Sequence, residues 1–150
     1  MAVKASEFDG RQWGSGLPPV TALLGDEPFF ITRTGDLWRQ MGKDQGFTER
    51  LVLDQTESEL ANRLLSELDA LSLFADRTLV ELRLTKTTLD KSLREALDRW
   101  TQNPPDDKRL LISGPKLGKS ETSSNWLQTL ETAAAVIEAT TVPAYQFTKW

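Results

Sequence analysis

Short apolar runs alternate with segments of helical spacing along most of the chain. Residues 20–24, Val-Thr-Ala-Leu-Leu, form a near-continuous apolar run of the kind expected for a strand buried on both faces. Four further runs are typical of short strands: 49–53, 78–84, 109–113 and 135–139. Between the strands, apolar residues at helical spacing predict helices from 29 to about 43, behind residues 56–59, along 89–100 and around 126–130.

Two of the expected helices begin with recognisable start signals. Asp26 is placed to cap the first helix, and Pro28 suits its first turn. Thr56 and Glu59 match a capping box ahead of the second helix. Both signals place a helix directly after a strand, as a strand–helix alternation requires.

Five strands that alternate with four helices predict a three-layer α/β/α fold with a mostly parallel five-stranded sheet. Residues 10–19 are rich in Gly and Pro, so residues 1–19 are expected to form an N-terminal extension and loop. Residues 20–142 are expected to form one α/β domain. Residues 143–150 are typical of the opening of another helix, and we expect the chain to be a piece of a longer protein in which this helix links to further domains.

The composition removes several classes of chemistry. The chain has neither cysteine nor histidine, so it can form no disulfide, no Ser-His-Asp or Cys-His site and no histidine metal site. An enzyme based on carboxylates or lysine remains open. The net charge is −4, and no short window is dominated by Lys and Arg, which disfavours strong duplex-DNA binding by this chain alone. A basic patch created by folding also remains open.

No apolar run approaches ~18 residues, and the N-terminus lacks the apolar core of a secretory signal. These absences predict no membrane partner and fit a cytoplasmic protein.

One glycine-rich segment resembles a phosphate-binding loop. Residues 114–120, Gly-Pro-Lys-Leu-Gly-Lys-Ser, follow a predicted strand and precede a predicted helix. The segment is one residue shorter than GxxxxGK[ST], and Pro115 removes one N–H donor. It also follows the fourth strand of the α/β pattern, whereas such a loop usually follows the first. A nucleotide-hydrolysing protein that uses Gly114 to Ser120 is the alternative hypothesis, and a basic turn is the simpler one.

The turn after the first strand is a second place where phosphate could bind. Asp26 and Glu27 occupy it, and two carboxylates at a helix N-terminus would repel a triphosphate. The adjacent acidic pairs here and at Asp106 and Asp107 are better explained by capping and solvation than by catalysis or metal binding. Three tryptophans on apolar helix faces, at 38, 100 and 126, are expected to lie in the core.

Leu73 and Phe74 follow the second helix and precede the third strand. Such a pair can turn inward and complete the core, or outward as an apolar contact for a partner protein. Composition alone favours the core, because Leu and Phe are usually buried.

An ordered set of segments resembles a known family. The segments are Ala-Leu-Leu-Gly-Asp-Glu-Pro at 22–28, Gln-Gly-Phe at 45–47, Leu-Ser-Leu-Phe-Ala-Asp-Arg at 71–77, and Leu-Leu-Ile at 110–112 followed by Lys-Leu-Gly-Lys at 116–119 and Trp126. Together they resemble the N-terminal domain of the delta subunit of bacterial DNA polymerase III, a component of the sliding-clamp loader. The resemblance runs from about residue 20 to residue 150.

The resemblance implies a fold like that of the clamp-loader ATPases without a functional phosphate loop, and therefore no intrinsic activity and no cofactor. It implies that Leu71, Ser72, Leu73 and Phe74 bind the beta sliding clamp, with Leu73 and Phe74 as the apolar plug that favours an open ring. It further implies contacts with other clamp-loader subunits through domains absent here, and with DNA only within the full complex. The holoenzyme concerned is a DNA-directed DNA polymerase, a nucleotidyltransferase. Many clamp-binding peptides carry Gln where this chain has Ala70, so that polar anchor is lost here.

Overall fold

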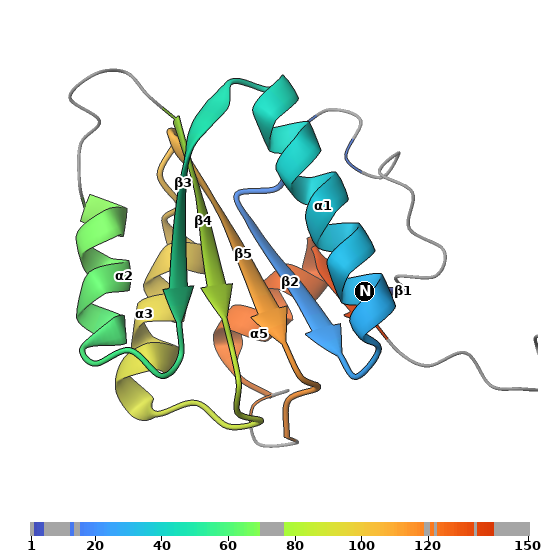
Figure 1. Ribbon diagram of the computed structural model, residues 1–150. Helices are drawn as coiled ribbons and strands as arrows, with labels where there is room; N and C mark the ends of the chain where they lie inside the picture. Colours follow the sequence, from blue (N-terminus) through green and yellow to red (C-terminus); the bar gives the residue numbers. More distant parts are fainter. Residues whose placement is uncertain are drawn as a thin grey trace, which may run out of the picture.

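A six-stranded parallel sheet forms the middle layer of the computed structural model (Figure 1). The structure describes residues 2–4, 13, 16–69, 77–118, 121, 123–133 and 135–139. The strand order is β1-β6-β2-β5-β4-β3, and every neighbouring pair is parallel. The strands are β1 (Ala2–Lys4), β2 (Val20–Gly25), β3 (Phe47–Asp54), β4 (Arg77–Arg83), β5 (Lys108–Gly114) and β6 (Val136–Ala139).

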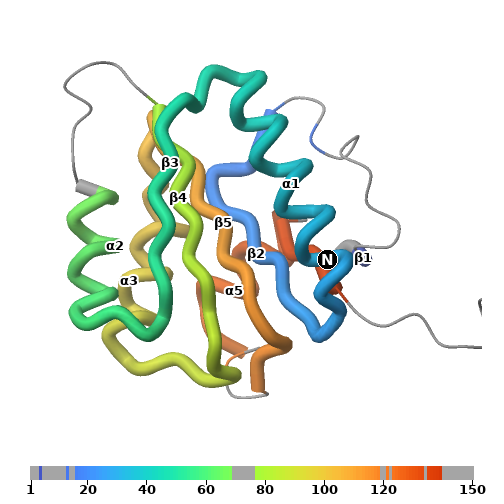
Figure 2. Tube along the Cα trace, viewed as in Figure 1, coloured from blue at the N-terminus to red at the C-terminus, as the bar shows by residue number. Residues whose placement is uncertain are grey.

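Helices cover both faces of this sheet. Helix α1 (Pro28–Asp44) lies on one face, and α2 (Leu60–Asp69), α3 (Lys91–Gln102) and α5 (Asn125–Thr132) lie on the other (Figures 1 and 2). The three-layer α/β/α prediction is therefore confirmed. The five strands expected from the sequence are all present and parallel.

Two apolar cores fill the spaces between the layers. The larger core lies between the sheet and helices α2, α3 and α5, and the smaller core lies under α1. Trp38 is fully buried in the smaller core, and Trp100 and Trp126 are fully buried in the larger one. The prediction that these tryptophans pack in the core is confirmed. The Trp100 indole N–H also donates to the Leu64 carbonyl oxygen at 2.9 Å, which joins α3 to α2.

Strand β1 was not expected from the sequence. Ala2, Val3 and Lys4 pair in parallel with Val136, Ile137 and Glu138 of β6, so the sheet has one strand more than expected. This strand lies within the region predicted to be an extension and loop. Three residues are too few to show the alternation by which a strand is recognised.

The predicted starts of two helices were wrong in detail. Helix α1 is capped by Glu27, whose carboxylate accepts from the Phe29 N–H at 3.2 Å, and not by Asp26. The capping box at 56–59 does not form, because α2 begins only at Leu60. The Thr56 hydroxyl and N–H both donate to the Asp54 carboxylate, at 2.8 and 2.9 Å, which lowers the pKa of Asp54. The Thr56 side chain is thus held by the residue that ends β3.

Among the described residues, no helix is both long enough and apolar enough to span a membrane.

Candidate functional site

The turn between β2 and α1 is where an α/β fold of this type would bind phosphate, because ligands bind outside the carboxyl ends of parallel strands. Only Asp26 and Glu27 separate the last residue of β2 from the first residue of α1. The N–H groups of both residues donate to the Ala139 carbonyl oxygen, at 2.9 and 3.1 Å. Pro28 has no N–H to offer. The amide groups of the two turn residues are therefore already bonded within the protein.

The end of β6 also packs closely against the β2–α1 turn. A Cβ atom added at Gly25 would lie 1.8 Å from the Ala139 carbonyl oxygen, so the end of β6 rests directly against the turn. The Glu27 carboxylate adds negative charge at the N-terminus of α1, where it satisfies the helix dipole. The turn thus lacks the free donors, the space and the charge that a triphosphate would need.

Residues 114–118, within the segment that resembles a phosphate loop, make structural contacts inside the domain. A Cβ atom at Gly114 would lie 2.6 Å from the Leu84 Cβ and 2.8 Å from the Leu84 carbonyl oxygen, so glycine is needed there for packing. The Gly118 N–H donates to the Thr87 carbonyl oxygen at 2.9 Å. Leu117 is buried, and the next helix with described bounds, α5, begins only at Asn125.

A buried carboxylate lies beside the same segment. Glu121 is 2% exposed, and its carboxylate accepts from the Leu89 N–H at 3.3 Å. The Arg94 guanidinium lies 3.9 Å from the same carboxylate, so Glu121 is paired within the protein. Lys119 and Ser120 lie outside the described residues. The described part of the loop offers no arrangement that favours the alternative hypothesis of nucleotide hydrolysis.

The sequence-predicted clamp-binding residues Leu71, Ser72, Leu73 and Phe74 lie outside the described residues. The residues on either side of this segment are described. Residues 70–76 connect Asp69, the last residue of α2, to Arg77, the first residue of β4. Arg77 lies at the amino end of a strand, whereas the β2–α1 turn lies at a carboxyl end. In a parallel sheet these ends are opposite, as Figure 1 shows.

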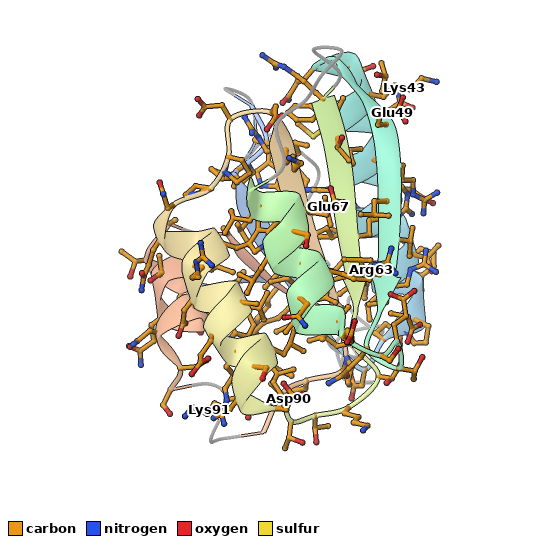
Figure 3. The ribbon with its side chains drawn as sticks, turned by 90° about the vertical axis from the view of Figure 1, so that its left-hand side faces the viewer. Lys43, Glu49, Arg63, Glu67, Asp90 and Lys91 are labelled. Atoms are coloured by element: carbon orange, nitrogen blue, oxygen red, sulfur yellow. The ribbon has the colours of Figure 1, made fainter. Side chains whose placement is uncertain are left out.

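The helix that leads into the segment has a polar outer face. Arg63 and Glu67 lie on this face (Figure 3), and the Arg63 guanidinium pairs with the Glu57 carboxylate at 2.8 Å. On the inner face Leu64 is fully buried, while Leu68 is partly buried against the core. Helix α2 is therefore held to the domain up to the last turn before the segment.

An aromatic ring and two arginines meet at the other end of the segment. The guanidinium carbons of Arg77 and Arg109 lie 5.3 and 4.9 Å from the centroid of the Phe47 ring. Arg77 donates to the Gln45 carbonyl oxygen at 3.4 Å. Burial lowers the pKa of Arg109, and the nearby charge of Arg77 lowers it further, while Asp106 acts in the opposite direction.

A second charged cluster lies on the α1 face of the sheet. Glu81 is 2% exposed, and its carboxylate pairs with Arg39 at 2.8 Å and with Arg50 at 2.5 Å. The hydrogen bond from Arg50 to Glu81 raises the pKa of Arg50. Arg83 lies 3.8 Å from the same carboxylate. The arginines compensate the charge of the buried Glu81 carboxylate. No cluster of acidic side chains suited to a metal ion occurs among the described residues.

Neither cluster was predicted from the sequence. Glu81 and Arg83 alternate with buried leucines along β4, and that alternation could have placed them on one face of the strand. The contact between Arg77 and Phe47 joins residues 30 positions apart and depends on the register of β3 against β4. No local sequence signal reports it.

Comparisons with known proteins agree with the fold. The family described as DNA polymerase III, delta subunit, matches residues 22–140. DNA polymerase III subunit delta of Escherichia coli (strain K12) is 28% identical over 139 residues, which make up 93% of this chain and 40% of that protein. The solved structure of the Bacillus subtilis DNA clamp loader delta protein matches with a TM-score of 0.67 at 20% identity, over 91% of this chain and 42% of that one.

The structural likeness shows a shared fold, and the chain spans about two fifths of the length of these relatives. The family match covers most of the chain, including the β2–α1 turn and the segment between α2 and β4. This chain therefore belongs to the DNA polymerase III delta subunit family.

Proposed function

We propose that this chain is the clamp-binding domain of a clamp-loader subunit that acts in DNA replication without hydrolysing nucleotide. Residues 71–74 bind the beta sliding clamp, with Leu73 and Phe74 entering an apolar pocket of the clamp. The observation that carries the proposal is the family match across residues 22–140, since it includes this segment. The blocked β2–α1 turn supports the absence of nucleotide chemistry.

The energetics suit such a contact. Burying a Leu or Phe side chain contributes roughly 1.5–3 kcal/mol, and a few such anchors commonly dominate an interface. The domain binds more tightly to the clamp conformation in which the ring interface is open. Binding therefore raises the population of that open conformation. Contacts with the other loader subunits then belong to the parts of the protein beyond this domain, and contact with DNA to the assembled complex.

Replacing both plug residues tests the proposal. Leu73→Ala with Phe74→Ala is expected to weaken binding to the beta clamp by at least about 100-fold, because two apolar anchors are removed. Binding is measured by calorimetry with the full chain, and the thermal midpoint is recorded for each variant. The midpoint is expected to stay within about 2 °C of the wild type, since removal of surface side chains has little effect on stability.

Phe29→Ala provides the matched control. Phe29 is 64% exposed in the first turn of α1, which follows the carboxyl end of β2, whereas the 70–76 segment joins the amino end of β4. Its clamp affinity is expected to equal that of the wild type. A large fall in the midpoint of the double variant would instead place Leu73 and Phe74 in the core, and unchanged clamp binding would refute the proposal.

A further inference from the structure

A cleft of about 530 Å³ lies beside α1, where the strands of the sheet reach their carboxyl ends. Its walls come from α1, from the ends of β4 and β5, and from single residues of β2 and β3. Among the described helices α1 alone lies on this face, and Figure 1 shows β3 and β4 beside it rather than beneath it. Clefts of this size commonly hold small ligands, and open α/β sheets bind ligands outside the carboxyl ends of their strands. Asp26 and Glu27 of the closed β2–α1 turn are not among the described residues that line the cleft.

Arg83 brings a cation with open hydrogen-bonding capacity to this cleft. Both oxygens of the buried Glu81 carboxylate already accept hydrogen bonds, from Arg39 and from Arg50. The Arg83 guanidinium lies 3.8 Å from that carboxylate, which is beyond hydrogen-bond distance, and its side chain is 51% exposed. Glu81 therefore leaves the N–H donors of Arg83 to another acceptor.

A hydroxyl group lies next to Arg83 on the same wall. Ser113 of β5 pairs with Arg83 in the register of the sheet, so the two side chains leave the same face at the spacing of neighbouring strands. The chain beyond β4 is held in place by Gln55, whose side-chain oxygen accepts from the N–H groups of Thr85 and Lys86, both at 2.8 Å. The donors on this wall are thus fixed before any ligand arrives.

The remaining lining decides which ligand fits. Leu23 and Leu111 offer apolar contacts for a short hydrocarbon stem. Asp54 also lines the cleft, and its carboxylate accepts from the Thr56 N–H and hydroxyl. An anion bound at Arg83 would meet the negative charge of Asp54, so its affinity should be weak. A phosphate group carries nearly two charges and would be repelled more strongly than a carboxylate, which carries one.

We propose that this cleft binds a carboxylate group on a short apolar stem, with the Arg83 guanidinium and the Ser113 hydroxyl as donors. Arg suits the role because its planar guanidinium can donate two parallel hydrogen bonds to one carboxylate. A glutamate side chain of a partner protein and a free dicarboxylic acid share this chemistry. The site is independent of the proposed clamp contact, since it uses none of residues 71–74.

NMR titration of the isotopically labelled full chain tests the proposal at constant salt. The two probes are glutarate and an acidic peptide of glutamate and alanine, while glutaramide has the same stem as glutarate without its charge. Glutarate or the peptide at millimolar concentration is expected to shift the amide signals of Arg83, Thr85 and Ser113 until they saturate, and glutaramide is expected to leave them in place. The probe that binds more tightly identifies the source of the carboxylate. If neither probe shifts these signals, or if glutaramide shifts them equally, the inference is overturned.

Three variants assign the binding to the cleft. Arg83→Gln is expected to weaken binding at least about tenfold, because hydrogen bonds between two charged groups are lost. Arg63→Gln is the matched control, since Arg63 is similarly exposed but lies on α2, on the other face of the sheet, and it is expected to bind like the wild type. Asp54→Asn removes the opposing charge and is expected to tighten binding about two- to fivefold.

The thermal midpoint of each variant is recorded, and titrations are made well below it. Unchanged affinity in Arg83→Gln would overturn the inference, as would an equal loss in Arg63→Gln. A purely structural effect of Arg83 would not make Asp54→Asn bind more tightly, so weaker binding by that variant would likewise contradict a carboxylate held beside Asp54.

Discussion

At the scale of single residues, Glu81 is a buried carboxylate with three arginines within 4 Å. Its carboxylate is buried in the face of the sheet beneath α1, and the arginines around it come from α1, β3 and β4. A buried charge is tolerated only where partners compensate it. Glu81 therefore links α1 to β3 and β4, at the edge of the sheet opposite β1.

Removing this carboxylate should destabilise the domain. Glu81→Ala is expected to lower the free energy of unfolding by about 1–3 kcal/mol, because hydrogen bonds to a charged group are lost while its partly exposed arginine partners regain water. Urea unfolding measures the change. Glu49→Ala, in the neighbouring β3, removes an exposed glutamate and is expected to change stability by less than about 0.5 kcal/mol. Equal effects of the two substitutions would contradict the importance assigned to the Glu81 cluster.

At the scale of elements, the β2–α1 turn is a short connection whose N–H groups are bonded within the protein, which leaves them unavailable to a phosphate group. The turn is closed by two N–H groups that share one carbonyl oxygen, and by a glycine that allows β6 to lie against it. The neighbouring helix start is completed by Glu27 rather than by a bound anion. The local structure is therefore complete without a phosphate group.

Gly25→Ala tests this close approach. The added Cβ would overlap the Ala139 carbonyl oxygen, so the substitution must displace either β6 or the turn, and we expect a loss of at least about 3 kcal/mol in thermal or urea unfolding. Gly46→Ala is the comparison, because Gly46 has a positive φ of 92° but no heavy atom within 4 Å of an added Cβ. Backbone strain alone should cost about 1–2 kcal/mol there. A smaller loss at Gly25 than at Gly46 would refute the packing argument.

The elements also show how far a sequence can be interpreted. Short apolar runs placed the five expected strands within a few residues, and apolar residues at helical spacing did the same for the four expected helices, because each signal comes from the residues of the element itself. The start of α2 was wrong because Thr56 is bonded to Asp54, a competition that no capping pattern reveals. The strand β1 was missed because three residues become a strand only when β6 is beside them. The Arg77 contact with Phe47 follows from strand register, which local patterns do not determine.

At the scale of the whole molecule, the parallel sheet places the β2–α1 turn and the proposed clamp-binding segment at opposite ends of its strands. The turn at which related folds bind nucleotide lies at the carboxyl end of β2, and the segment proposed to bind the clamp joins β4 at its amino end (Figure 1). The N–H groups of the β2–α1 turn are bonded within the protein, which supports the proposal that this domain does not bind nucleotide. Under the proposed function, we therefore expect clamp binding by this domain to be independent of ATP.

Thermal unfolding with and without Mg-ATP tests that separation. A ligand present at 100 times its Kd stabilises a protein by about 2.7 kcal/mol, which for a chain of this size would raise the midpoint by several degrees. We expect millimolar Mg-ATP to leave the midpoint unchanged, because the turn that would receive the phosphates has no free N–H group. A P-loop ATPase measured in the same buffer serves as the positive control. A rise in the midpoint that Lys119→Ala removes would instead establish the segment from Gly114 to Ser120 as a nucleotide site, and the absence of nucleotide chemistry proposed for this domain would be wrong.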